Sequence, residues 1–107
     1  MSKISFDSII ALFSSEKFQD ALNAIEGLIY DNPNDAVLFN IRGACYAGLN
    51  QINLAKENYE KAIAINPEYS KAHFNLAGVF HELDDFDAAV ESYQNAILLE
   101  RSEEHTS

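Results

Sequence analysis

An Asn-Pro pair occurs twice in this chain, and the distance between the two copies limits the fold more than any other feature. Asn32-Pro33 and Asn66-Pro67 lie 34 residues apart. Shifting the sequence by 34 residues also aligns five further sets of chemically similar residues, which are Leu12, Tyr46 and Phe80; Phe18, Ile52 and Phe86; Ala21, Ala55 and Ala89; Ile25, Tyr59 and Tyr93; and Leu28, Ala62 and Ala96. A period of about 20–50 residues indicates a protein built from stacked structural repeats.

Each repeat has the apolar spacing of two short α-helices joined by a turn. Ala55, Tyr59, Ala62 and Ile63 fall at the i, i+4, i+7 and i+8 positions of one helical face. Short polar or glycine-containing stretches separate the two helices of each repeat, at residues 14–17, 48–51 and 82–85. The sequence therefore predicts helices at about residues 3–14, 18–31, 35–48, 52–65, 69–82 and 86–100.

Two polar residues that follow the prolines are expected to begin the next helices. Asp35 and Ser70 each stand two or three residues after a proline, and Asp and Ser side chains favour the N-cap position. We therefore predict that both are N-caps.

The whole pattern resembles the tetratricopeptide repeat (TPR), a helix-turn-helix unit whose residues run aromatic-x-x-Leu-Gly-x-x-Tyr, then Ala-x-x-x-Phe/Tyr, then Pro. The second repeat matches at Phe39, Gly43, Tyr46, Ala55, Tyr59, Ala62 and Pro67. The third repeat matches at Leu76, Ala77, Phe80, Ala89, Tyr93 and Ala96. The departures are Arg42 at the leucine place, His73 at an aromatic place, Arg101 at the last proline place, and Ser5, Ser8 and Ile9 at the start of the first repeat.

The resemblance implies an all-α protein, a right-handed α-solenoid of three helix-turn-helix hairpins. It covers residues 2–103, with repeats at about 2–35, 36–69 and 70–103, and 101–107 form a polar C-terminal tail. Gly43 and Ala77 are small where the helices of a hairpin must approach closely. Ile9 stands at the same place in the first repeat and implies a looser first hairpin.

TPR proteins bind a peptide or helix of a partner in a concave groove lined by the first helix of each hairpin. The corresponding places here are Lys3, Phe6, Ile10, Phe13, Val37, Asn40, Ala44, Ala47, Lys71, Phe74 and His81. The N-terminal wall of this groove is apolar, and exposed apolar clusters often mark interaction sites. The alternative is that Phe6, Ile10 and Phe13 belong to the core of an irregular first hairpin.

One TPR subtype, the carboxylate clamp, holds the acidic tails of heat-shock chaperones with lysine, asparagine and arginine side chains. The clamp places read Phe6, Ile10, Ile41, Lys71 and Asn75, so only Lys71 is retained. We therefore expect an apolar or basic-amphipathic protein partner rather than an acidic tail.

The charge balance also restricts the partners. The chain has 17 acidic and 7 basic residues and a net charge of −10, which disfavours binding to nucleic acid. No run approaches the roughly 18 apolar residues of a membrane span, and no basic leader precedes the apolar stretch at 9–13. The single cysteine, Cys45, fits a reducing compartment, so a cytoplasmic location is expected.

No catalytic or metal-binding constellation is recognisable. His73 and His81 are eight residues apart, whereas zinc enzymes pair helical histidines four apart. Cys45 is best explained as a small packing residue. We therefore expect no cofactor and no metal, and a non-catalytic protein-interaction module. The alternatives are a TPR arm of a larger enzyme or a self-assembling module.

The C-terminal end raises the self-assembly alternative. The residues after Glu100, RSEEHTS, are too few and too polar to cover an apolar face. The face that they would leave partly bare consists of Val90, Tyr93, Ile97 and Leu98. Either the chain is part of a longer TPR protein, which we favour, or this end pairs with a second copy as a homodimer.

Overall fold

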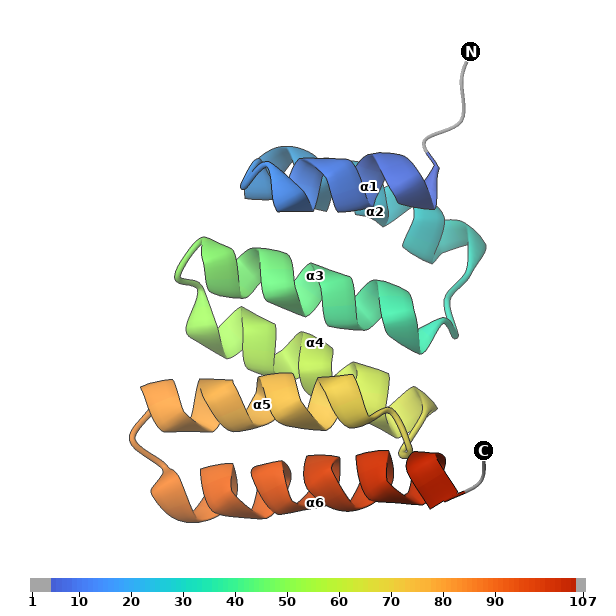
Figure 1. The fold of residues 1–107 in the computed structure, drawn as a ribbon. Coiled ribbons are helices and arrows are strands. Elements are labelled where there is room, and N and C mark those ends of the chain that lie inside the picture. Colours follow the sequence, from blue (N-terminus) through green and yellow to red (C-terminus); the bar gives the residue numbers. More distant parts are fainter. Residues whose placement is uncertain (1–4, 106–107) are drawn as a thin grey trace.

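The computed structural model describes residues 5–105, with side chains as far as residue 102. Within this range the chain forms only α-helices: α1 (Phe6–Ser14), α2 (Phe18–Asp31), α3 (Ala36–Gly48), α4 (Ile52–Ile65), α5 (Ser70–Glu82) and α6 (Phe86–His105) (Figure 1). The predicted fold class, an all-α solenoid of helical hairpins, is confirmed.

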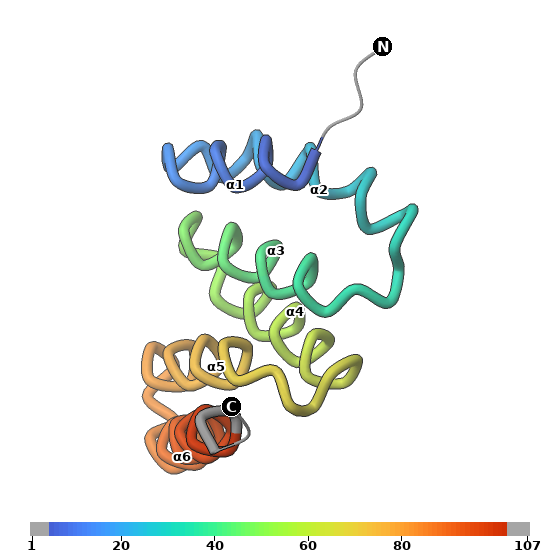
Figure 2. The backbone as a smooth tube through the Cα atoms, turned by 45° about the vertical axis from the view of Figure 1, so that its right-hand side comes forward, coloured from blue at the N-terminus to red at the C-terminus, as the bar shows by residue number. Residues whose placement is uncertain are grey.

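The hairpins stack in sequence order, with α1 and α2 at one end and α6 at the other (Figures 1 and 2). The second helix of one hairpin packs on the first helix of the next, α2 on α3 and α4 on α5. In addition α3 contacts α5 directly. The first helices, α1, α3 and α5, therefore form one layer of the stack, as the repeat predicts.

Small residues allow the helices of a hairpin to approach closely. A Cβ atom added at Gly43 in α3 would lie 2.7 Å from the Tyr59 ring and 3.2 Å from the carbonyl oxygen of Ala55, both in α4. Ala77 in α5 is fully buried. In the first hairpin Ile9 is fully buried too, packed with Ile25 and with Leu38 of α3, so the larger side chain is accommodated in the core.

The turn inside each hairpin has the same backbone geometry. Glu16, Asn50 and Asp84, each 34 residues from the next, have φ angles of 59°, 62° and 60°. At the second turn the N–H of Gln51 donates to the carbonyl oxygen of Tyr46 at 2.8 Å, and equivalent bonds close the other two turns. This is the Schellman arrangement, in which a left-handed residue ends the helix and satisfies its last carbonyl groups.

The two predicted N-caps have different outcomes. Asp35 is the N-cap of α3, where its Oδ1 accepts a hydrogen bond from the Val37 N–H at 3.0 Å. The prediction for Ser70 is wrong: Ser70 is the first residue of α5, its side chain is buried, and Tyr69 takes the cap position without a capping side-chain bond.

The first and last helices differ in length from the sequence-based estimate. α1 begins at Phe6 rather than at residue 3, because the Ser5 hydroxyl caps it by accepting a hydrogen bond from the Ser8 N–H. α6 continues to His105 rather than ending at residue 100. Pro33 and Pro67 stand two residues after α2 and α4, whereas Arg101 at the equivalent place is a good helix former. Most of the segment expected as a tail is thus helical.

Candidate functional site

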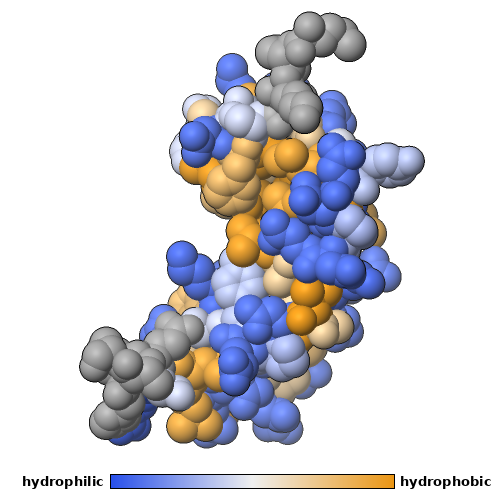
Figure 3. All heavy atoms as spheres, turned by 90° about the vertical axis from the view of Figure 1, so that its right-hand side faces the viewer, coloured by the Kyte–Doolittle hydropathy of each residue, from blue (hydrophilic) through white to orange (hydrophobic). Residues whose placement is uncertain are grey.

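Four large apolar side chains stand exposed on the layer formed by α1, α3 and α5. Phe6, Ile10, Val37 and Phe74 are between 38 and 58% exposed. Phe6 and Phe74 occupy the same place in the first and third repeats, and therefore the same face of α1 and α5. Figure 3 shows an indentation along the left outline of the molecule, between its upper and lower halves, with apolar residues beside it.

The middle of this face is occupied by a polar network. Asn40, at the place of Phe6 and Phe74, is buried. Its Nδ2 donates to the Tyr69 hydroxyl at 3.3 Å, and its Oδ1 accepts from Asn75 Nδ2 at 3.0 Å. Burial raises the pKa of Tyr69, and the hydrogen bond from Asn40 opposes this change. The amide of Asn40 thus joins α3 to α5 and the preceding turn, and both of its ends are already bonded within the protein.

Two hollows flank the network. The first, of about 270 Å³, lies between α3, α4 and α5, and Ala47, Asn75 and Gly78 are among the residues that line it. A Cβ atom added at Gly78 would meet nothing within 4 Å, so this part of the wall is open. The second, of about 630 Å³, lies beside the turns between hairpins, where Val37 and Tyr69 contribute to its lining.

The other residues predicted for the groove are placed differently. Phe13 is half-buried, and its ring meets the Phe18 ring edge to face at 5.5 Å, so it contributes to the core of the first hairpin. Ala44 is half-buried and Lys71 is exposed. His81 is exposed, and the centroid of its ring lies 5.6 Å from the centroid of the Phe86 ring. Lys3 lies outside the described residues.

The residues expected to be partly bare on the last helix are open to solvent, with one exception. Val90, Ile97 and Leu98 are each more than half exposed. Tyr93 is half-buried because its ring packs edge to face on Phe74 at 5.5 Å. Phe86 is also more than half exposed and was not predicted, although its position four residues before Val90 places it on the same helical face.

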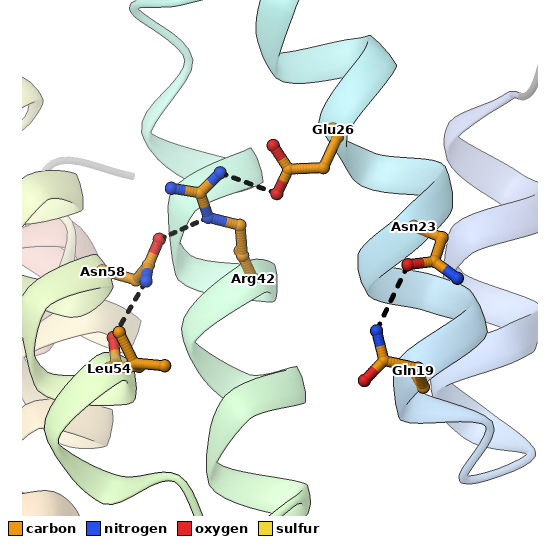
Figure 4. Close-up of polar contacts among 6 residues, drawn as sticks. All are labelled: Gln19, Asn23, Glu26, Arg42, Leu54 and Asn58. Carbon is orange, nitrogen blue, oxygen red and sulfur yellow. Dashed lines mark hydrogen bonds and ion pairs between the residues drawn. The ribbon is translucent and has the colours of Figure 1, made fainter.

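Arg42, the departure at the leucine place, links three helices, α2, α3 and α4. It lies apart from the exposed apolar side chains of α1 and α5. Its Nε donates to Oδ1 of Asn58 in α4 at 2.7 Å, and its Nη1 pairs with Oε1 of Glu26 in α2 at 3.0 Å (Figure 4). The guanidinium also lies 5.4 Å from the centroid of the Phe39 ring. A charged side chain is thus satisfied where the family pattern has an apolar one.

Sequence reasoning missed Tyr69 and Asn75 as part of this face. The sequence places Asn75 only at a clamp position, and it places Tyr69 at the start of the helix expected at 69–82, whereas Tyr69 precedes α5 in the structure. One signal was available: Asn40 is an amide at a place that is aromatic in the other two repeats. A buried amide needs polar partners nearby, and residues of the next hairpin were the natural candidates.

The one cysteine is not available for chemistry at neutral pH. Cys45 is fully buried, and burial raises its pKa to about 11, so the thiol stays protonated. Among the side chains that the structure describes, no group of three His, Cys, Asp or Glu residues could hold a metal ion. No helix between residues 5 and 105 is long and apolar enough to cross a membrane.

Comparison with known proteins identifies similar repeats and folds. A family model described as "TPR repeat" matches residues 43–84, and one described as "Tetratricopeptide repeat" matches residues 70–103. Hsp70-Hsp90 organizing protein 3 of Arabidopsis thaliana is 32% identical over 85 residues, which are 79% of this chain and 15% of that relative. The chain therefore spans only a small part of that relative's length.

Solved structures share the fold. The structure described as "MamA 41-end from Desulfovibrio magneticus RS-1" has a TM-score of 0.84 and 28% identity, and the match covers 91% of this chain and 55% of that one. The structure described as "Second TPR of Spaghetti (RPAP3) bound to HSP90 peptide SRMEEVD" has a TM-score of 0.83 and 22% identity, with 87% and 86% covered.

Proposed function

The chain belongs to the tetratricopeptide repeat family, and we propose that it is a non-catalytic module that binds a peptide or helix of a partner protein along α1, α3 and α5. One observation carries this proposal: Phe6, Ile10, Val37 and Phe74 are exposed on successive first helices. Single exposed apolar residues are normal on a protein surface, but a row of them on one side marks an interaction site.

The relatives support peptide binding, and the residues of this chain suggest a different kind of peptide. The RPAP3 domain was solved with an HSP90 peptide, and the Arabidopsis relative is named for Hsp70 and Hsp90. In this chain, however, apolar Phe6, Ile10 and Ile41 stand at three clamp places, and Asn75 at a fourth is bonded to Asn40. The partner peptide is therefore apolar or basic-amphipathic, and the net charge of −10 also disfavours an acidic tail.

The same proposal covers catalysis and location. The module itself performs no reaction, and any chemistry belongs to the partner or to other parts of a larger protein. The compartment is the cytoplasm, which a single buried thiol supports because such a protein needs no disulfide for stability.

The test is a pair of charge substitutions on the exposed apolar face. Phe6→Glu/Val37→Glu replaces two exposed side chains, whereas Phe13 is unsuitable because its ring packs on Phe18. Tyr30→Glu in α2 is the control, because Tyr30 is 87% exposed and lies outside the α1, α3 and α5 layer. Proteins captured from a lysate of the source cells should be lost with the double variant and kept with the control.

Two results would contradict the proposal. If the double variant captures the same proteins as the unchanged chain, the exposed apolar face is not the binding surface. If a labelled SRMEEVD peptide binds the unchanged chain and Lys71→Ala abolishes that binding, the partner is an acidic tail held in clamp fashion. Circular dichroism of each variant confirms that the helices are intact.

A further inference from the structure

A second apolar surface lies on α6 and adjoins the face formed by the first helices where Tyr93 packs on Phe74. Phe86, Val90, Tyr93 and Ile97 are spaced i, i+4, i+7 and i+11, so they form one stripe along the helix. This set is called the α6 stripe below. α6 is the last helix of the stack, at the end where a further hairpin would pack (Figures 1 and 2).

The same places are covered in the earlier hairpins. In α2 the places of Val90 and Ile97 hold Leu22, which is 4% exposed, and Ile29, which is half-buried, and both pack on residues of α3. In α6 the residues at the places of Leu22 and of Ile29 are Val90 and Ile97, which are 54% and 55% exposed. The exposed part of the α6 stripe is therefore an apolar helix-packing surface like its equivalent in α2. Tyr93 and Phe86 contact Phe74 and His81 of α5, but among the described residues no further helix covers Val90 and Ile97.

The opposite end of a second copy does not fit this surface. The places by which α3 and its C-cap meet α2 include Ile41, Cys45 and Leu49, and the equivalent residues of the first hairpin are Asp7, Ala11 and Ser15, all exposed. Copies stacked head to tail would thus set Asp7 and Ser15 against the apolar stripe. Burying these polar groups without partners is costly, so the surface does not lead to a chain of stacked copies.

The charges around the stripe identify a better occupant. Asp87 and Glu91 each follow a stripe residue by one position, about 100° around the helix, and Glu100 lies on the other side. Arg101 is the only lysine or arginine in α6. Two copies joined through their α6 helices would bring these acidic rims together, each on a chain of net charge −10.

We infer that the α6 stripe binds an amphipathic helix of a partner protein, with an apolar face that covers Phe86, Val90 and Ile97 and with lysine or arginine residues along its edges. The apolar face of this helix covers α6 in the way that α3 covers α2 and α5 covers α4. The basic edges pair with Asp87 and Glu91, which selects against acidic helices and against a second copy.

The test uses a designed peptide rather than an unknown partner. A fluorescent peptide of about 18 residues, or five helical turns, carries leucine on one face and lysine along both edges; its twin carries glutamate in place of lysine. Binding is measured by fluorescence anisotropy with the unchanged chain, with Val90→Glu/Ile97→Glu, and with Phe6→Glu/Val37→Glu. Val90→Ser/Ile97→Ser serves as an uncharged substitute if circular dichroism shows helix loss in the first variant.

The lysine peptide should bind the unchanged chain and the glutamate twin should not. Because the proposed groove also accepts a basic-amphipathic helix, binding to α6 is measured in the chain that carries Phe6→Glu/Val37→Glu, where the lysine peptide should still bind. Adding Val90→Glu/Ile97→Glu to that chain should raise the dissociation constant at least about tenfold, because a carboxylate would have to be buried under the peptide.

Three outcomes would overturn the inference. The first is loss of binding with Phe6→Glu/Val37→Glu and none with the α6 variant, which would place the peptide in the groove. The second is equal binding of both peptides, which would remove the role of the acidic rim. The third is a dimer in sedimentation experiments that becomes a monomer with Val90→Glu/Ile97→Glu, which would make a second copy the occupant.

Discussion

Replacing Gly43 by alanine tests whether helix approach in the second hairpin is as close as the structure indicates. The new methyl carbon would lie 2.7 and 2.8 Å from two carbons of the Tyr59 ring and 3.2 Å from the Ala55 carbonyl oxygen. The ring has little freedom to move away, because Tyr59 is buried and packs with Leu76 and Val79 of α5. α3 and α4 must therefore separate, or the ring must push α5 aside.

Two effects of opposite sign determine how much Gly43→Ala changes the free energy of unfolding. Alanine is favoured over glycine inside a helix by about 1 kcal/mol. Overpacking a well-filled core costs about 1–3 kcal/mol. The net free energy of unfolding should therefore fall by between about 0 and 2 kcal/mol with Gly43→Ala.

Gly27 and Gly78 provide matched controls for the first effect. A Cβ atom at either of them meets nothing within 4 Å. Gly27→Ala and Gly78→Ala should therefore raise the free energy of unfolding by up to about 1 kcal/mol. The difference between Gly43→Ala and Gly27→Ala isolates the packing cost, about 1–3 kcal/mol, or a difference of at least about 4 °C in Tm.

Urea unfolding followed by circular dichroism measures all three variants. The reasoning is refuted if Gly43→Ala stabilises the chain as much as Gly27→Ala does. A further check is a double-mutant cycle with Tyr59→Leu, in which the cost of Gly43→Ala should shrink because the ring that it meets is gone.

Three further predictions concern polar groups. Arg42→Ala should lower the free energy of unfolding by about 1–3 kcal/mol, because it removes the hydrogen-bond donor of buried Asn58. Glu26→Gln should lower it by less than about 1 kcal/mol, because it breaks only an exposed ion pair. Equal losses for the two variants in urea unfolding would contradict this. Asp35→Ala should cost about 0.5–2 kcal/mol and Asp35→Asn much less, since asparagine also caps; equal losses in Tm would contradict the capping role. Burial raises the pKa of Cys45 from 9.0 to about 11, so the folded state holds this proton more tightly. The contribution of this protonated thiol to the free energy of unfolding is complete below pH 9 and is lost as the pH rises toward 11, with about 1 kcal/mol lost by pH 10. Cys45→Ala should therefore reduce the fall of the urea midpoint between pH 8 and pH 10.5.

The fold could be predicted because the feature that determines it, the repeat period, is visible in the amino-acid sequence. A 34-residue period with helical apolar spacing leaves few architectures other than stacked hairpins. Helix ends were less predictable, because a cap depends on backbone geometry as well as on residue type. Asp35 and Ser70 are both good capping residues, yet α3 and α5 begin at equivalent places of the repeat, Ala36 and Ser70, so Tyr69 rather than Ser70 stands at the cap place that Asp35 occupies.

The candidate site was predicted only as a set of places on one face of the repeats. The register correctly identified side chains such as Phe6 and Phe74 as residues of the first helices, and the structure finds both exposed. It could not show that Phe13 and Asn40 are engaged by residues of other elements, the Phe18 ring and the Tyr69 hydroxyl. The contact of Phe13 depends on how α1 and α2 pack within the first hairpin, and the contact of Asn40 depends on the angle between the second and third hairpins; a periodic sequence specifies neither.

The packing of each helix mainly on its neighbours in the chain has a consequence for how the protein is made. Apart from the contact of α3 with α5, the substantial helix contacts among the described residues join consecutive helices. Such local contacts permit rapid folding, because each helix packs on a neighbour that is close to it in the sequence. During synthesis, which proceeds at about 5–20 residues per second, the first two hairpins can therefore pack before α6 has left the ribosome.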